Sequence, residues 1–438
     1  MKILVLNTPL FVEPITNHKD QSLPPLGLGF IVASLRKDGF MVTFVDAFLQ
    51  NLSVTELLKI IDDVDPAFIV MNVFSANLMV VYKIIAQIKT SINIVLGGGT
   101  NQVHQEILNW DFSQAIYVIL GEGELILPEI IKGKYNEYLV KRNNIFVVSV
   151  NPSSKFFPHE ISDLEIDHSI FLNEPFFHHQ GFWEAYISVN RGCIYNCAFC
   201  GSARSLNSSV SIRTRSIVSV QKEIDGLIKL YPHLEAIRVL DDLFLQNSSS
   251  AVHAIKIFEK YSLSWRSTAH ILSLSAISDD LLRKMRESGC RELFIGIESG
   301  SPRILKMIHK TLDIGLVKQT VKRVMDHEIN VKGYFIMGFP TESTDDLQMT
   351  LDLAEDLHVI SSSSIGQFRT SVFRFRPYHG TELFNYIYPN IKKIQANEQD
   401  LILSEKIGRA QFNVTSGNHS ETEEQILQEF IYKMSTIR

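Results

Sequence analysis

Short apolar runs alternate with longer amphipathic stretches through the first third of the chain. The apolar runs have the length of buried strands and occupy residues 3–6, 42–45, 68–72, 92–96 and 116–120. The stretches between them have helical periodicity, and one opens with the capping box formed by Ser53 and Glu56. This alternation predicts an α/β fold with a parallel sheet covered by helices on both faces, and ligands at the loops that follow the strands.

The rhythm stops in residues 133–182, which are predicted to form a linker, and then resumes. Six further strands are expected at residues 185–189, 236–239, 264–268, 293–297, 331–337 and 370–375. Six strand-helix repeats predict a partial (β/α)6 barrel of the TIM type, with active-site groups on the loops after the strands. The predicted domain limits are 1–132, 133–182, 183–385 and 386–438, and the last of these is a small C-terminal segment with a helix opened by Ser420 and Glu423.

Composition narrows the class of protein. Of 438 residues, 45% are hydrophobic and the formal net charge is -6, so nothing in the total favours nucleic acid or an anionic membrane. No apolar run approaches the roughly 18 residues of a membrane span, and the first apolar run is too short for a signal peptide. A cytoplasmic location without membrane association is therefore expected.

Three of the four cysteines, Cys193, Cys197 and Cys200, lie within eight residues, directly after a predicted strand. Three thiolates on one tight loop suit three corners of a 4Fe-4S cluster and leave the fourth iron without a protein ligand. A structural zinc site usually has four ligands in two pairs, and His178, His179 and Cys290 lie outside this loop. Zinc and a metal-free reactive thiol remain as alternatives.

The Cys-x3-Cys-x2-Cys loop, with Phe199 before its last cysteine, resembles the signature of the radical S-adenosylmethionine (SAM) superfamily. The resemblance continues in residues 237–244, 293–301, 333–342 and 373–383, all at predicted strand ends. It implies an enzyme that cleaves SAM reductively to methionine and a 5'-deoxyadenosyl radical, with an electron donor such as flavodoxin or ferredoxin. The residues that the resemblance implies as SAM contacts are Phe199, Asp241, Asp242, Glu298, Ser299, Lys310, Ile336 and Gly338.

For each acidic residue among these, a salt bridge or a helix cap is the alternative, and Gly296, Gly300 and Gly338 could serve sharp backbone turns. Two residues depart from the family pattern. Thr341 stands where a glycine is common, and His379 stands where a proline is common.

Residues 1–132 resemble the cobalamin-binding domain, with a Rossmann-like or flavodoxin-like fold, that precedes the radical domain in one branch of this superfamily. The matching segments are residues 24–47, 94–103 and 118–130. No Asp-x-His-x-x-Gly motif follows the first strand, which implies cobalamin bound without a lower histidine ligand. A domain that keeps only the fold is the alternative. The candidate cobalamin contacts are Asn7, Pro25, Leu26, Gly27, Gly97, Gly98, Gly99, Gly121, Glu122 and Gly123.

Together the two resemblances imply methylation of an unactivated carbon, or of phosphorus, in a small molecule or peptide. Rearrangement or oxidative cyclisation is an alternative with the same cofactors, and a non-catalytic cobalamin or redox sensor is an alternative of another class. Methylthiotransferases are set aside because no cysteine precedes Cys193. Candidates for facing the substrate, or otherwise for pairing with acidic groups, are Trp265, Arg266, His270, Arg374, Arg376, Tyr378 and His379.

Overall fold

The computed structural model describes residues 1–10, 12, 23–172, 174–178, 181–207, 211–310, 313–389 and 418–437. The chain forms two compact units. As far as these ranges are described, the first contains Met1–Asn173, Arg204–Ser211 and Arg376–Ser416, and the second contains Glu174–Ala203, Ile212–Phe375 and Gly417–Arg438. In the described ranges, no helix combines the length and the hydropathy that a membrane span requires.

The first unit is built on a seven-stranded sheet with the order β2-β1-β3-β4-β5-β7-β6, parallel except for β6. The order 2-1-3-4-5 is that of flavodoxin-like folds, as expected. Every residue of β3 is buried, because a parallel strand with helices on both faces has no solvent-facing side. The strands are β1 (Lys2–Asn7), β2 (Met41–Asp46), β3 (Phe68–Val73), β4 (Asn93–Gly98), β5 (Ile116–Gly121), β6 (Val140–Arg142) and β7 (Ile145–Val150).

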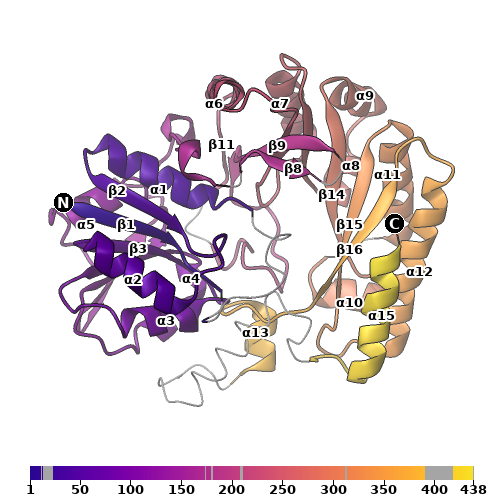
Figure 1. Ribbon diagram of the computed structural model, residues 1–438. Helices are drawn as coiled ribbons and strands as arrows, with labels where there is room; N and C mark the ends of the chain where they lie inside the picture. The colour runs from indigo at the N-terminus through magenta and orange to yellow at the C-terminus, as the bar shows by residue number, and fades with distance from the viewer. Residues whose placement is uncertain are drawn as a thin grey trace. The chain divides into compact units, whose positions relative to one another are not determined.

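Helices lie on both faces of this sheet (Figure 1). Helices α1 and α5 contact each other, and α2 and α3 contact each other on the opposite face. The predicted capping box of α2 is confirmed, because the Ser53 hydroxyl accepts from the Glu56 backbone while the Glu56 carboxylate accepts from Ser53. The helices are α1 (Leu26–Lys37), α2 (Val54–Val64), α3 (Leu78–Ile85), α4 (Thr100–Ile107) and α5 (Leu127–Ile131).

No strand was expected in segment 133–182, yet its described residues contain β6, β7 and β8 (Phe176–His178). Strand β7 pairs in parallel with β5 along its whole length, and β8 pairs with the second unit's sheet. Two short 3-10 helices, Ile161–Asp163 and His168–Ile170, lie between β7 and β8. Strand β7 was not predicted because its apolar run stands between polar and proline-containing segments. Four of its six side chains are buried.

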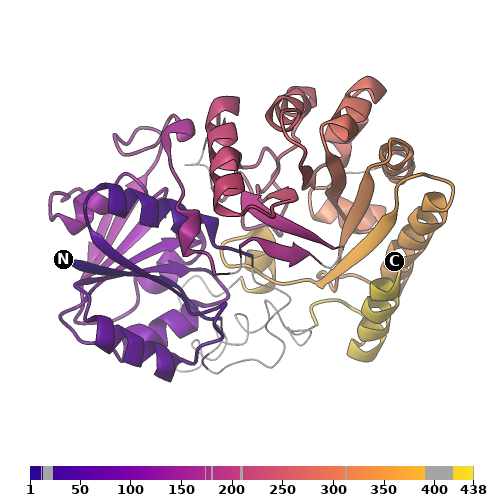
Figure 2. The ribbon, with the colours of Figure 1, turned by 45° about the horizontal axis from the view of Figure 1, so that its top comes forward.

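The second unit is a partial barrel, as predicted. Its sheet has the order β16-β15-β14-β13-β12-β9-β8, and the six strands from β9 to β16 are parallel. Helices cover the outer face of the curved sheet (Figure 2). The strands are β9 (Phe182–Ile187), β12 (Ala236–Val239), β13 (Ser264–Ala269), β14 (Cys290–Glu298), β15 (Asn330–Met337) and β16 (Phe368–Arg374). The helices are α6 (Ile217–Leu230), α7 (Ser248–Phe258), α8 (Ile271–Ser275), α9 (Asp279–Glu287), α10 (Pro302–Met307), α11 (Ile314–Asp326) and α12 (Thr344–Ser361).

Helix α15 (Glu424–Thr436) packs beside α12 and the edge strand β16 (Figure 1). The Thr370 hydroxyl donates to the Met434 carbonyl at 2.7 Å. A helix on the edge strand protects its unpaired backbone groups from another chain. The helix start expected at Ser420 and Glu423 is wrong for Ser420, because the helix begins after Glu423 and the Ser420 hydroxyl bonds to Asn418 instead. The predicted limit between 385 and 386 falls inside α13 (Glu382–Ile387), and residues 390–417 of the predicted segment lie outside the described residues.

Candidate active site

Asp241, directly after β12, fixes the start of the cysteine loop. Its carboxylate accepts hydrogen bonds from the backbone of Val189 at 2.8 Å and of Asn190 at 2.7 Å, and from the Ser188 hydroxyl at 3.1 Å. Burial raises the pKa of Asp241 to about 7, although these three donors favour the charged form. Asp241 therefore aligns the end of β9 with β12, and a contact with SAM stays a prediction.

Arg215 fixes the far end of the same loop. Its guanidinium donates to the Ser188 carbonyl at 2.9 Å and forms an ion pair with Glu223, with both side chains almost inaccessible to solvent. Two short strands, β10 (Asn190–Arg191) and β11 (Arg213–Thr214), pair antiparallel beside it. The loop that carries the cysteines is thus closed at its base by the chain's own hydrogen bonds.

The three thiols of this loop lie close enough to influence one another's pKa. Burial raises the pKa of each, that of Cys200 to about 12, and neighbouring thiols contribute to the shifts of Cys197 and Cys200. The Cys200 sulfur accepts from the Ser202 backbone at 3.4 Å. Three soft donors gathered on one loop fit three corners of a 4Fe-4S cluster, which would bind them as thiolates.

The fourth cysteine, Cys290, lies away from the loop that carries the other three. Cys290 is the first residue of β14 and fully buried, so it lies at the amino end of that strand. In the described ranges, no group of three or more His, Cys, Asp or Glu side chains is placed to share one metal ion.

Glu298 and Lys310 form a buried ion pair at the carboxyl end of β14, with Lys310 Nζ 2.8 Å from Glu298 Oε1. The charge of Lys310 opposes the rise that burial causes in the pKa of Cys193 and Cys197, which places the ion pair beside the cysteine loop. A Cβ on Gly296 would lie 2.2 Å from Glu298 Oε1 and 2.7 Å from Lys310 Nζ. Gly296 therefore makes room for the ion pair rather than for a turn.

Phe199 is brought next to the end of β15, as expected for residues that share one ligand. Its ring meets the ring of Phe339, the residue after Gly338, edge-on with centroids 5.8 Å apart. Ile336 is partly exposed in β15, and Gly338 has a φ of +92°, which favours glycine. The Ala198 backbone donates to the Ile308 carbonyl at 3.1 Å, so the end of α10 also meets the cysteine loop.

Ser299 and Asp242 have different surroundings. The Ser299 hydroxyl is fully buried and bonds to the Thr350 hydroxyl at 3.0 Å, which ties the end of β14 to α12. Asp242 is exposed, and its carboxylate accepts a hydrogen bond at 2.8 Å from the hydroxyl of Ser202, which follows Cys200 by two residues. Tyr195 of the cysteine loop stacks on His270 with centroids 4.0 Å apart. Asp242 and His270 therefore flank the loop, and their contacts with a ligand stay predictions.

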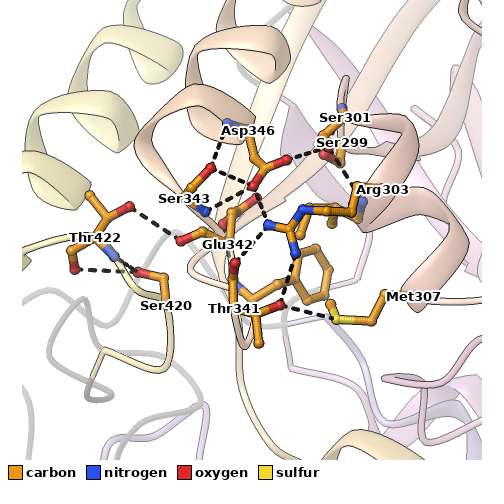
Figure 3. A network of polar contacts seen from close by, with 12 residues as sticks. Ser299, Ser301, Arg303, Met307, Thr341, Glu342, Ser343, Asp346, Ser420 and Thr422 are labelled. Atoms are coloured by element: carbon orange, nitrogen blue, oxygen red, sulfur yellow. Dashed lines mark hydrogen bonds and ion pairs between the residues drawn. The ribbon is translucent and has the colours of Figure 1, made fainter.

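Thr341, where the family pattern has a glycine, has a φ of +62°, a conformation that β-branched residues rarely adopt. Arg303 holds it there through a bond to the Thr341 carbonyl at 2.6 Å and another to its hydroxyl at 3.1 Å (Figure 3). Arg303 also pairs with Asp346 at the start of α12. The chain thus supports an unfavourable backbone conformation with an added cation.

Glu342 lies at the centre of the same network (Figure 3). Its Oε2 accepts from the backbone of Gly338 at 2.5 Å and of Phe339 at 3.1 Å, whereas its Oε1 is buried without a partner in the described part of the chain. Burial raises the pKa of Glu342 to about 8. A protonated Glu342 would therefore hold the Gly338 turn at neutral pH.

The Glu342→Gln variant is expected to remove a pH dependence of stability. Because the pKa of Glu342 is raised from 4.5 to about 8, the folded chain binds more protons than the unfolded chain between these values. Its contribution is complete below pH 4.5 and is lost as the pH rises through 8, by up to about 5 kcal/mol. Urea unfolding at pH 5, 6.5 and 8 should show a steeper decline for the natural chain; parallel profiles would contradict this.

The candidate cobalamin contacts lie at the carboxyl edge of the first unit's sheet. The glycines among them differ in how much free space surrounds them. A Cβ on Gly97 or Gly27 would meet nothing within 4 Å, whereas one on Gly99 would lie 2.9 Å from the Phe74 ring and one on Gly121 2.3 Å from the Val150 carbonyl oxygen. The chain's own packing therefore requires Gly99 and Gly121 but leaves open space at Gly97, which fits the close approach of a flat ligand.

The remaining candidates also lie at the ends of these strands and at the start of α1. Gly98 has a φ of +90°. Pro25 and Leu26 begin α1, and Glu122 and Gly123 follow β5 with partial exposure.

Asn7 belongs to a buried polar network that the sequence analysis missed. It donates to Asp46 at 2.7 Å and accepts from Asn72 at 2.7 Å, and Asn72 in turn accepts from the Thr8 backbone at 2.8 Å. Asn77 donates to the Thr8 hydroxyl at 2.5 Å. A cluster of amides at strand ends was the available signal. Its hydrogen bonds fix the loops after β1, β2 and β3.

His379 is buried in the first unit, and neither ring nitrogen has a hydrogen-bond partner in the described residues. Its backbone donates to Ser75, just after β3, at 3.1 Å, and its ring packs on Phe384. Burial lowers the pKa of His379 to about 4, so the ring is neutral at pH 7. Two unpartnered ring nitrogens at this edge fit a ligand with polar substituents such as the amides of a corrin.

Three of the candidates for facing the substrate have structural roles, and for the two arginines this role is the pairing with acidic groups that was the alternative. Trp265 is fully buried and stacks on Phe258 at 5.0 Å. Arg266 is paired with buried Glu184 and Glu292, and Arg374 pairs with Glu424 of α15. Arg376 and Tyr378 fall in the first unit.

Comparison with known proteins agrees with this geometry. The model of the radical SAM superfamily matches residues 187–354, and that of the B12 binding domain matches residues 14–131. An uncharacterized methyltransferase of Pyrococcus horikoshii is 26% identical over 402 residues, which cover 89% of this chain and 84% of the relative.

Solved structures support the fold. The radical SAM methyltransferase TsrM of Kitasatospora setae has a TM-score of 0.63 at 14% identity, with 90% of this chain and 77% of that chain covered. The cobalamin-dependent SAM radical enzyme OxsB with aqua-cobalamin bound has a TM-score of 0.59 at 18% identity, with 81% of this chain covered. The chain spans about half the length of OxsB, 52%.

The fold, the cysteine loop and these matches define a radical SAM enzyme. Because a B12 binding domain precedes the radical domain, the chain belongs to the cobalamin-dependent radical SAM enzymes. Its cofactors are accordingly a 4Fe-4S cluster, SAM and cobalamin.

Proposed function

We propose that this protein is a cobalamin-dependent radical SAM methyltransferase that methylates an unactivated carbon or a phosphorus of a small molecule or peptide. The observation that carries the proposal is the convergence of the three loop thiols with the buried Glu298–Lys310 pair. When bound, the cluster and SAM supply a deoxyadenosyl radical, and cobalamin supplies a methyl carrier. The Pyrococcus relative and TsrM are both named as methyltransferases, which supports methyl transfer.

The chain's own residues would bind and orient these groups. Cys193, Cys197 and Cys200 would hold three irons, while Asp241 and Arg215 keep the loop in place. Glu298 and Lys310 present opposite charges that suit the ammonium and carboxylate of methionine. Phe199, which is partly exposed and packs against the buried ring of Phe339, offers apolar surface to a purine. An electron donor such as flavodoxin or ferredoxin would reduce the cluster.

Labelled SAM tests this proposal without knowledge of the acceptor. The reconstituted chain with cobalamin, dithionite and SAM carrying a CD3 group should release both S-adenosylhomocysteine and 5'-deoxyadenosine, and the label should appear on the corrin. A cyclase or rearrangement enzyme would release 5'-deoxyadenosine without labelling the corrin, and a sensor would release neither product. Either result would overturn the proposal.

The Gly97→Ala variant is expected to bind cobalamin roughly tenfold more weakly than the natural chain, because an added methyl group fills space that the corrin needs. Its thermal midpoint should change little, since the methyl group meets no protein atom. Gly121→Ala is the matched control for an effect on stability. It should lose on the order of 2 kcal/mol of folding free energy, because the φ of Gly121 is +95°. Corrin absorbance after gel filtration and calorimetry measure both effects. Equal cobalamin affinity in Gly97→Ala and the natural chain would contradict the assignment.

A further inference from the structure

The inner face of the second unit's sheet carries more positive than negative charge. Side chains of a strand alternate between faces, and in β15 the partly exposed Lys332 and Tyr334 alternate with fully buried Val331 and Phe335. Lys332 pairs in register with Arg369 of β16 and with Phe294 of β14. These positions therefore lie on the face opposite the outer helices.

On the described strands β9 and β12 to β16, this face carries four cations and two carboxylates below the Glu298–Lys310 pair. The carboxylates of Glu184 and Glu292 are bound by Arg266, and Glu292 also by Arg369 at 2.7 Å. The other two cations, Arg238 and Lys332, have no ion-pair or hydrogen-bond partner in the described part of the chain, and Arg238 Nε is buried without one. The face thus has two positive charges in excess.

Aromatic rings surround these two cations. The Arg238 guanidinium lies over the Phe294 ring, 4.6 Å from its centroid, and Phe294 stacks on Tyr334 at 5.9 Å. The Lys332 ammonium lies 5.4 Å from the Tyr334 centroid. Cation–π contacts contribute about 0.5–2 kcal/mol each and leave the charge of a partly buried cation without a counter-ion. A bound anion would supply the counter-ion that Arg238 and Lys332 lack among the described residues.

The neighbouring cations also act on Lys332 itself. Burial, and the charges of Arg369, Arg238 and Arg266, lower the pKa of Lys332 to about 8. An anion bound beside it would relieve this repulsion, and guanidinium groups bind carboxylates and phosphorus oxyanions through paired hydrogen bonds.

We propose that Arg238 and Lys332 bind an oxyanion group, a carboxylate or a phosphorus oxyanion, of the methyl acceptor, an assignment that rests on the proposed methyl transfer. Lys332 and Ile336 are four residues apart on β15, about 13 Å along the strand. The acceptor would thus be anchored deep on the inner face, with its reacting carbon toward the carboxyl ends of the strands, where Phe199 and Gly338 lie.

Binding of two probes, methylphosphonate and acetate, to the holoprotein with cluster, cobalamin and SAM tests the assignment. Titration calorimetry of the natural chain should detect at least one probe, and the stronger one identifies the class of oxyanion. Arg238→Gln and Lys332→Met should each weaken that probe at least tenfold, whereas Lys332→Arg should retain it. Arg291→Gln, an exposed cation on β14, is the matched control and should bind as the natural chain does.

Formation of 5'-deoxyadenosine from SAM separates the possible failures. Arg238→Gln and Lys332→Met should still produce 5'-deoxyadenosine at the rate of the natural chain with dithionite, and this result also shows that both variants fold. Loss of this product, or of SAM binding, in Arg238→Gln would mean that the cations serve SAM and would overturn the assignment. Failure of both probes to bind the natural chain, or equal binding by the variants, would also overturn it. Failure of the natural chain to label the corrin would instead refute methyl transfer alone.

Discussion

The Cys197→Ala variant is expected to contain less than a tenth of the cluster iron of the natural chain and to release no detectable 5'-deoxyadenosine from SAM. Cys197 lies between Cys193 and Cys200, and its thiol senses the charges of Cys193, Lys310 and Glu298. Because three protein thiolates are the minimum set for a cluster with one open iron, losing one removes a corner. Alanine is preferred to serine, since a hydroxyl can replace a thiolate as a weak ligand.

The fourth cysteine provides the control. Cys290→Ala removes a fully buried thiol at the amino end of β14, away from the cysteine loop, and should retain the full iron and sulfide content and the rate of 5'-deoxyadenosine release. Iron, zinc and acid-labile sulfide are measured after anaerobic reconstitution, and product by chromatography. One zinc per chain without sulfide, or full activity in Cys197→Ala, would refute the assignment of the loop.

The order of strands and helices was predictable where apolar periodicity is strong. The strands expected at 68–72, 236–239 and 331–337 agree with β3, β12 and β15 within one residue at each end. Strand β7 was missed because its six residues stand between polar turns without a helix before them. Its place in the sheet depends on pairing with β5, which is a tertiary contact that local periodicity cannot reveal.

The residues of the candidate site also fall into those that the sequence places together and those that only the fold brings together. The three cysteines and Phe199 come from one contiguous motif, so the sequence alone places them together. Arg238 and Lys332 are 94 residues apart, counted from 238 to 332, and meet only through the register of four strands. An arginine inside an apolar strand and a lysine alternating with apolar residues were the available signals. Their lack of partners is visible only in three dimensions.

Arg266 was a candidate for facing the substrate, with pairing to acidic groups as the alternative, and the structure has the pairing. Its guanidinium bonds to Glu184 at 2.7 and 2.5 Å and to Glu292 at 3.0 Å. Although burial opposes it, the bonds from Arg369 and Arg266 hold the pKa of Glu292 below its ordinary value. All three side chains are 2% exposed or less, so no water replaces a lost partner.

The Arg266→Met variant is therefore expected to lose about 3–5 kcal/mol of stability, because Glu184 would remain buried without its only ion-pair partner in the described residues. Calorimetry of the cofactor-free chain should show the midpoint of the second unit falling by several degrees while that of the first unit is unchanged. Arg283→Ala is the control, since its pairs with Asp280 and Glu287 are exposed, screened by solvent and therefore contribute little to stability. The Glu184→Gln, Arg266→Met double variant should recover part of the loss, because the unpaired charge is then gone. A double variant as unstable as the sum of the two single variants would mean that Arg266 stabilises the barrel by packing rather than by neutralising Glu184.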